Sequence, residues 1–194
     1  TGRRASLPYP ALRGANQVLN ASSALAALEA LSDRLPVSQQ AVREGLLTVE
    51  IPARFQVLPG RPTVVLDVAH NPHAAAVLAT NLDNMGFFPR THAVFGMLRD
   101  KDVAGVIARL GARIDRWHVG PTPGARGADS TWLATFVRNA SGEASEPSVQ
   151  EYAALADAYN AALAEVEVDD RIVVFGSFTT VAEVMRARAS GPDQ

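Results

Sequence analysis

Asp67, His70 and Asn71 stand within one short segment that directly follows an apolar run ending at Leu66. The run predicts a buried strand, and Asn71 followed by Pro72 predicts the N-cap and the first position of a helix. A carboxylate, an imidazole and the positive end of a helix would then meet at the C-terminal edge of a sheet, where open α/β sheets bind ligands. Asp67 could accept hydrogen bonds from hydroxyl groups, and His70 could contact an anionic or polar group. The alternative is a helix cap beside a turn histidine.

Two further segments carry polar side chains where a ligand could be held. Arg54 lies in a connector, from which an arginine can reach across a cleft and clamp a phosphate. An arginine on the solvent-exposed surface is the alternative. Ser177 follows Gly176 between a predicted strand and a predicted helix, where it would either bind a carboxylate or cap the helix. The pattern G-x-S-x-G does not surround it, which excludes a nucleophile elbow.

Lys101 and Arg126 are further candidates for binding an anion. Lys101, the only lysine of the chain, comes just before a predicted helix that Asp102 would cap, and Arg126 lies in a glycine-containing loop. His92 and His118 show no metal-ligand spacing and are interpreted as strand residues. The sequence contains neither a G-x-x-x-x-G-K-[ST] loop nor a G-x-G-x-x-G pattern after the first strand, so no phosphate cradle is visible.

Alternating strands and helices would position these side chains. Strands are expected at 64–67, 92–96, 114–119 and 171–175, and helices at 72–85, 103–110, 130–138, 150–166 and 179–189. This alternation predicts parallel βαβ units with right-handed crossovers, and hence a doubly wound α/β domain over residues 61–194. Two helices at 16–31 and 38–46 are too small to bury a core alone.

The composition is that of a globular protein, since 47% of the 194 residues are apolar. A net charge of −2 gives no general reason to expect binding to nucleic acid or to a membrane surface. No apolar run approaches a membrane span, and no signal peptide is visible. The absence of cysteine excludes a disulfide framework and a thiolate metal site, and it fits a reducing compartment.

The order of these segments resembles the C-terminal part of the folylpolyglutamate synthase and dihydrofolate synthase family, within the Mur ligase superfamily. The Asp-Val-Ala-His-Asn-Pro segment is the most specific piece. The family connector reads Pro-Gly-Arg, whereas Ala53 precedes Arg54 here, a departure expected to affect hinge flexibility more than the chemistry of the arginine. The matching pieces are residues 12–14, 17, 20–21, 52–55, 67–72, 95–96, 100–102 and 176–178.

The resemblance implies three parts of the chain. Residues 1–50 would be the tail of a central ATPase domain, residues 51–60 an interdomain connector, and residues 61–194 a Rossmann-like glutamate-ligase domain. The P-loop and the magnesium ligands of the family would lie in the missing N-terminal part of the same polypeptide. ATP and Mg²⁺ are the implied cofactors, L-glutamate and a pteroate or folate are the implied substrates, and the implied location is cytoplasmic.

The resemblance also implies roles for single residues. Asn20 would contact the adenine of ATP, Arg54 its phosphates and Asp67 the ribose hydroxyls. His70 and Ser177 would line the pocket of the incoming glutamate, with His70 as the candidate catalytic residue. Two basic residues, Lys101 and Arg126, are further candidates for the same pocket.

Two other functions remain open from the residues. The chain could be the C-terminal domain of another Mur-type amino-acid ligase that acts on a murein precursor. It could also be a non-catalytic α/β module that binds a small anion. A P-loop upstream in the same polypeptide would support a ligase, and a reading frame that begins near Thr1 would support the module.

Overall fold

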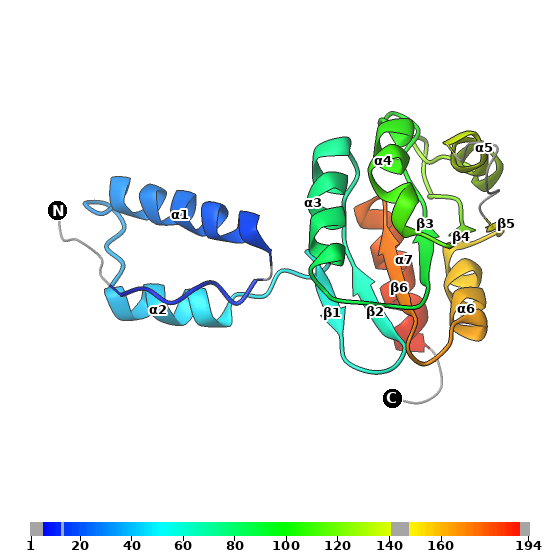
Figure 1. The fold of residues 1–194 in the computed structure, drawn as a ribbon. Helices are drawn as coiled ribbons and strands as arrows, with labels where there is room; N and C mark the ends of the chain where they lie inside the picture. The colour runs from blue at the N-terminus through cyan, green and yellow to red at the C-terminus, as the bar shows by residue number, and fades with distance from the viewer. Residues whose placement is uncertain (1–5, 13, 141–147, 191–194) are drawn as a thin grey trace. The chain divides into compact units, whose positions relative to one another are not determined.

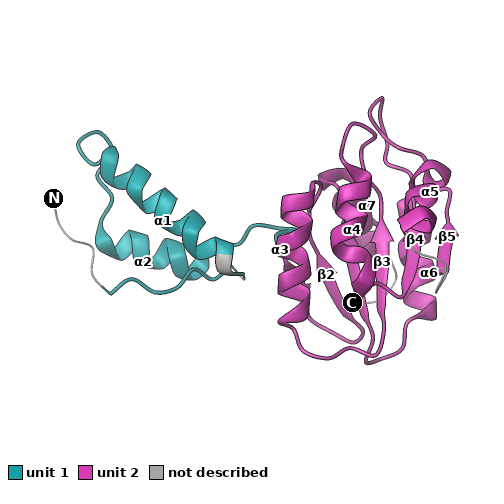
Figure 2. Cartoon of the chain, turned by 45° about the horizontal axis from the view of Figure 1, so that its top comes forward, with its two compact units in different colours: residues 1–54 teal, residues 55–194 magenta. Residues whose placement is uncertain are grey.

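The computed structural model describes residues 6–12, 14–140 and 148–190 (Figure 1). The chain divides into two compact units, residues 1–54 and residues 55–194 (Figure 2). The polar loop expected at 141–147 lies outside the described residues. In the described ranges, no helix is both long enough and apolar enough to cross a membrane.

The smaller unit contains two helices, α1 (Ala15–Ala30) and α2 (Gln39–Thr48). Ser38 starts α2 because its hydroxyl oxygen accepts a hydrogen bond from the N–H of Ala41 at 3.1 Å, which satisfies a free donor of the first turn. Within the described part of these helices, Val42 alone is buried. The unit therefore buries little apolar surface of its own.

The larger unit is built on a six-stranded sheet with the order β1-β2-β6-β3-β4-β5. β1 pairs antiparallel with β2, and the other neighbours are all parallel. β3 and β6 are buried along their whole length, as central parallel strands covered on both faces must be. The strands are β1 (Gln56–Leu58), β2 (Thr63–Leu66), β3 (Thr91–Phe95), β4 (Arg116–Val119), β5 (Ser148–Glu151) and β6 (Arg171–Phe175).

Helices cover both faces of the sheet (Figure 1). One group consists of α3 (Pro72–Asp83), α4 (Val103–Leu110) and α5 (Ser130–Ala140), in which α4 packs against both α3 and α5. A 3₁₀ turn at Gly111–Arg113 follows α4 directly. The other group is the pair α6 (Leu155–Glu165) and α7 (Phe178–Ser190), which pack against each other. This arrangement confirms the predicted doubly wound, mostly parallel α/β fold.

An aromatic cluster forms the centre of the core. The ring centroids of Phe95 on β3 and Phe175 on β6 lie 5.1 Å apart, and Trp117 on β4 meets Phe95 edge-on at 5.6 Å. All three side chains are fully buried. Such pairs add about 0.5–1.5 kcal/mol each beyond the burial of their area, so they help to hold the neighbouring strands β6, β3 and β4 together.

Two strands of the sheet depart from the sequence-based expectation. β1 lies inside residues 51–60, which were expected to form a connector, and β5 together with a short turn occupies the start of the helix expected at 150–166. Both are short strands at the edges of the sheet, and neither contains a buried residue. Edge strands face water along one side, so they lack the apolar run that identifies a central strand.

Ala53 has an unfavourable backbone conformation at the position where the family connector has glycine. Its φ is 61°, in the left-handed region, and its side chain is buried. A Cβ atom in this region costs roughly 1 kcal/mol, which glycine avoids. The departure from the family pattern therefore adds local strain next to Arg54, besides any effect on flexibility.

Gly176 and Gly124 offer a matched test of packing at the strand ends. Both have positive φ, 116° and 92°, but a Cβ at Gly176 would lie 2.2 Å from the carbonyl oxygen of Gly96, whereas one at Gly124 would meet nothing within 4 Å. We expect Gly124→Ala to lower the free energy of unfolding by about 1 kcal/mol through conformation alone. Gly176→Ala should cost about 3 kcal/mol or more, because overpacking is added.

Denaturant unfolding followed by tryptophan fluorescence measures both variants, since Trp117 packs near Phe175. Equal losses in the two variants would show that the contact between Gly176 and Gly96 does not constrain the fold.

Candidate active site

The carboxyl ends of β2 and β6 bring three predicted site residues to one edge of the sheet. β2 and β6 are neighbours, yet α3 and α7, the helices that follow them, belong to opposite layers (Figure 1). Open α/β sheets bind ligands beyond the strand ends at such a switch point. Asp67 and His70 follow β2, and Ser177 follows β6.

Asp67 is half-buried, and the backbone holds both of its carboxylate oxygens. Oδ1 accepts a hydrogen bond from the N–H of Ala69 at 2.7 Å, and Oδ2 accepts one from the N–H of Phe55 at 2.9 Å. These two bonds fix the orientation of the carboxylate directly after the end of β2. A carboxylate held in this way is a hydrogen-bond acceptor at the sheet edge.

His70 is oriented by one hydrogen bond of its ring. Its Nδ1 lies 2.9 Å from the carbonyl oxygen of Val68, which can only accept, so Nδ1 carries the proton. In the neutral ring Nε2 is then an acceptor. Asn71 caps α3 by accepting from the N–H of Ala74 at 2.9 Å, and Pro72 begins the helix, which confirms both predictions. The imidazole therefore stands directly before the positive end of α3.

The hydroxyl of Ser177 is buried and already engaged. It accepts from the N–H of Thr180 at 2.9 Å and lies 2.7 Å from the hydroxyls of Thr179 and Thr180. Thr180 donates its own proton to the carbonyl oxygen of Gly96 at 2.6 Å, so Ser177 must donate to Thr180. Ser177 thus caps α7, the second of the two roles expected for it, and orders the N-terminus of that helix.

Lys101 and Arg126 approach one carboxylate from two different loops. Lys101 Nζ lies 3.4 Å and Arg126 Nη1 3.6 Å from Oδ2 of Asp100. The loops are joined because the N–H of Arg99 donates to the carbonyl oxygen of Arg126 at 2.8 Å. Burial would raise the pKa of Asp100, but hydrogen bonds from its own backbone and from Lys101 outweigh burial, and the pKa is lowered. The two cations are thereby held beyond the ends of β3 and β4.

Asn20 and Arg54 line one cavity of the smaller unit. The amide of Asn20 donates to Gln17 Oε1 at 3.0 Å on the exposed side of α1. The cavity measures about 710 Å³ and is mostly apolar. It is lined by Pro10, Leu12, Gln17, Asn20, Ala21, Ala24, Leu25, Leu28, Val37, Ala41, Val42, Gly45, Leu46, Val49, Ile51 and Arg54.

Thr180 and Phe178 are neighbours of the site to which the sequence analysis assigns no role. Thr180 ties the start of α7 to the end of β3, and it is fully buried. Phe178 is 60% exposed, and its ring centroid lies 6.4 Å from that of His70. A threonine in the first turn of a helix is common, so only the tertiary contact with Gly96 distinguishes this one.

The larger unit is thus an α/β domain with an oriented carboxylate, an imidazole and two helix N-termini at the switch point of its sheet, the place where open α/β sheets bind ligands. The model of the family described as "Mur ligase, glutamate ligase domain" matches residues 53–178. The chain therefore belongs to the Mur ligase family, through its glutamate ligase domain.

Proteins of known activity agree with this membership. The dihydrofolate synthase/folylpolyglutamate synthase of Escherichia coli K12 is 41% identical over 175 residues, which make up 89% of this chain and 39% of that protein. The structure of E. coli FolC in complex with DHPP and ADP has a TM-score of 0.81 and 37% identity, covering 96% of this chain and 41% of that one.

The crystal structure of a bifunctional folylpolyglutamate synthase/dihydrofolate synthase with Mn, AMPPNP and L-glutamate bound has a TM-score of 0.77 and 38% identity. The match covers 95% of this chain and 41% of that one. The chain thus spans about two fifths of the length of these relatives.

Thr180 and Thr179 allow the hydroxyl network at the start of α7 to be tested. Thr180→Val leaves the buried carbonyl of Gly96 without its 2.6 Å donor, so we expect a loss of about 1–3 kcal/mol in the free energy of unfolding. Thr179→Val removes an exposed hydroxyl of the same turn and should change stability by less than about 0.5 kcal/mol. Thermal and denaturant unfolding compare the two, and similar values would show that Thr180 does not join α7 to β3.

Proposed function

We propose that this chain forms the C-terminal part of an ATP-dependent ligase that joins L-glutamate to dihydropteroate or to a folate. The observation that carries the proposal is the edge formed by Asp67, His70 and the start of α7 in a chain of the glutamate ligase domain family. The relatives' own descriptions name both synthase activities, and their complexes contain ADP, DHPP or L-glutamate.

The residues of the chain fit a nucleotide. Asp67 carries an oriented carboxylate, a group that accepts hydrogen bonds from the hydroxyls of a ribose, and Arg54 carries a guanidinium that suits phosphate. Asn20 has a side-chain amide that can donate and accept hydrogen bonds at the edge of an adenine. We expect the ligands of Mg²⁺ to lie outside this chain. When bound, ATP with Mg²⁺ supplies the phosphoryl group that turns the carboxylate of the pteroate or folate into an acyl phosphate.

Glutamate would be held at the sheet edge by its charges. The first-turn N–H groups of α7, ordered by the capping hydroxyl of Ser177, favour a carboxylate. Lys101 and Arg126 add positive charge beyond the neighbouring strand ends. The two carboxylates of glutamate would then bind at two separate positive groups, one at the first turn of α7 and the other at Lys101 and Arg126.

His70 would serve the amine of glutamate. That amine must lose a proton before it can attack the acyl carbon, and a neutral imidazole is suited to accept it. Because Nδ1 donates to Val68, Nε2 is the acceptor available for this purpose. Closure of the chain against the missing ATPase part would keep water from the reactive acyl phosphate.

Ligase activity can be tested in a chimera whose N-terminal part comes from the E. coli relative and whose C-terminal part is this chain. We expect ATP hydrolysis that depends on both L-glutamate and dihydropteroate or a folate, and none from the 194-residue chain alone. Turnover by the isolated chain would contradict the proposed division of the active site. Turnover of a UDP-linked murein peptide instead of a pteroate would assign the chain to a murein ligase.

The two substrates should respond to different residues of the chimera. Asp67→Asn should raise the KM for ATP by about tenfold or more, because a charged acceptor contributes about 1.5–3 kcal/mol. His70→Ala should lower kcat and raise the KM for glutamate. The matched controls are Asp157→Asn and His73→Ala, both at exposed helix positions. The proposed roles would be contradicted if Asp157→Asn or His73→Ala lowered activity as much as the variant it controls. They would also be contradicted if Asp67→Asn and His70→Ala changed the KM values for ATP and glutamate to the same extent.

A further inference from the structure

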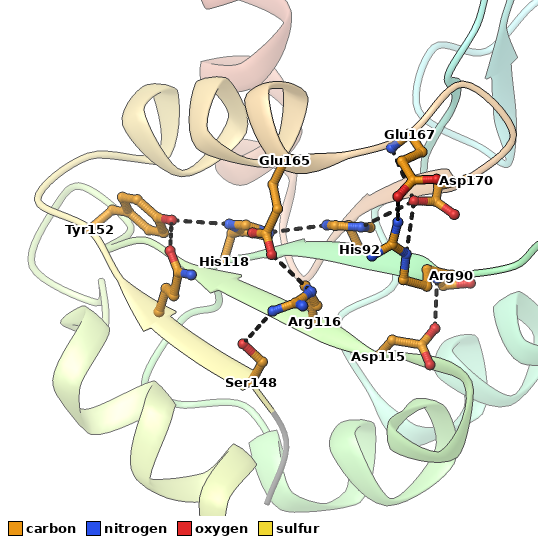
Figure 3. A network of polar contacts seen from close by, with 12 residues as sticks. Arg90, His92, Asp115, Arg116, His118, Ser148, Tyr152, Glu165, Glu167 and Asp170 are labelled. Atoms are coloured by element: carbon orange, nitrogen blue, oxygen red, sulfur yellow. Dashed lines mark hydrogen bonds and ion pairs between the residues drawn. The ribbon is translucent and has the colours of Figure 1, made fainter.

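A buried polar cluster lies between β3, β4 and the end of α6 (Figure 3). His92 on β3 and His118 on β4 point to the same face, and both are fully buried. Glu165, the last residue of α6, directs its carboxylate toward the two imidazoles (Figure 3). One ring nitrogen of each histidine and one carboxylate oxygen all lie within 4.8 Å of one another.

We propose that His92, His118 and Glu165 bind one transition-metal cation of the zinc class. His92 Nδ1 lies 3.3 Å from His118 Nε2, and His118 Nε2 lies 3.6 Å from Glu165 Oε2. A tetrahedral zinc ion with bonds of about 2.0–2.1 Å places neighbouring ligand atoms roughly 3.3–3.4 Å apart. Two edges of the cluster therefore already have nearly the length that such an ion requires.

Each outer ring nitrogen of the cluster has an oxygen atom nearby. His118 Nδ1 lies 3.1 Å from the hydroxyl of Tyr152, which donates to Gln150 at 2.5 Å (Figure 3). His92 Nε2 faces Asp170 Oδ2 at 3.7 Å. Metal-bound histidines usually turn their second N–H toward an oxygen, which fixes the ring.

The carboxylate ligand is held in the same way. Glu165 Oε1 accepts from Arg116 Nε at 2.8 Å, which leaves Oε2 for the cation. The guanidinium thereby fixes the orientation of the carboxylate without occupying the oxygen that faces His118.

Without a metal ion, neither way of placing a proton between the two facing imidazole nitrogens gives every ring nitrogen a hydrogen-bond partner. If His92 donates from Nδ1 to His118, then Nε2 of His92 is a lone pair that faces the carboxylate of Asp170, and this buried atom has no hydrogen-bond partner. If His118 donates instead, its Nδ1 needs the proton that Tyr152 gives to Gln150. A cation on the two facing nitrogens lets every N–H point to an oxygen.

Charge and ligand type favour a zinc-class ion. Three carboxylates (Glu165, Glu167 and Asp170) and two guanidinium groups (Arg90 and Arg116) surround the neutral rings, which leaves one negative charge. Burial lowers the pKa of both imidazoles, that of His118 to about 4, so both are in the neutral form that binds metals. Ca²⁺ and Mg²⁺ prefer oxygen ligands throughout, whereas two imidazoles and a carboxylate suit zinc.

The site would fasten the end of α6 to β3 and β4, and it shares no residue with the proposed substrate edge formed by Asp67, His70 and Ser177. Three protein ligands leave a fourth position for water. The proposal is therefore independent of the ligase activity, and it can be tested on the 194-residue chain without any substrate.

The test is titration of the chelator-treated chain with Zn²⁺ by calorimetry and with Co²⁺ by visible absorption. We expect one equivalent of each ion to bind, an absorption spectrum typical of tetrahedral Co²⁺, and a rise in the melting temperature with Zn²⁺. His118→Ala should weaken Zn²⁺ binding by more than about 100-fold, and Tyr152→Phe by about 10-fold through the outer contact. His73→Ala, at an exposed position on α3, is the matched control and should bind as the parent chain does.

Glu165→Gln provides a second ligand variant if His118→Ala does not fold, because Glu165 is half-buried and the change keeps its shape. It should also weaken binding, with an unchanged circular dichroism spectrum. The proposal is overturned if no stoichiometric binding of Zn²⁺ occurs. It is equally overturned if Glu165→Gln and Tyr152→Phe bind as tightly as the parent chain, or if His73→Ala loses binding.

Discussion

The insertion of β6 between β2 and β3 is the constraint on which the larger unit depends. β6 forms parallel ladders with both neighbours, and all five of its residues are buried. The chain reaches the far edge of the sheet at β5 and must return through α6 to make these ladders. Because the return reverses the direction of winding, the right-handed crossover from β5 to β6 places α6 on the face opposite α3, α4 and α5, and α7 packs beside α6.

This reversal also creates the site. It sets the end of β6 beside the end of β2, so that Ser177 and Asp67 follow adjacent strands although 110 positions of sequence separate them. The strand ends approach closely enough for Gly176 to lie against the carbonyl of Gly96, which in turn accepts the hydroxyl proton of Thr180. Hydrogen bonds within the fold thus fix the polar groups of this edge before any ligand arrives, which reduces the ordering that binding requires.

The central strands and most helices could be predicted because their signals are local. β-branched and aromatic runs such as 171–175 identify a buried strand, and Asn71 followed by Pro72 identifies a helix start. β1 and β5 were not predicted because their three and four residues are all half-exposed or exposed, and their strand conformation depends on the pairing partner. The same limit applies to Lys101 and Arg126, which become neighbours only because their loops join.

By itself, the sequence determined the family, the alternation of strands and helices, and the position of Asp67 and His70 in one turn. These features can be recognised in short segments, because the hydrophobic period and the capping residues involve positions that are close together in the sequence. Only the tertiary structure decided that Thr180 joins the start of α7 to Gly96, and that His92, His118 and Glu165 meet in one buried cluster. Such groups come together through the strand order and register, which are set by the packing of the whole sheet. No local spacing records which strands will become neighbours.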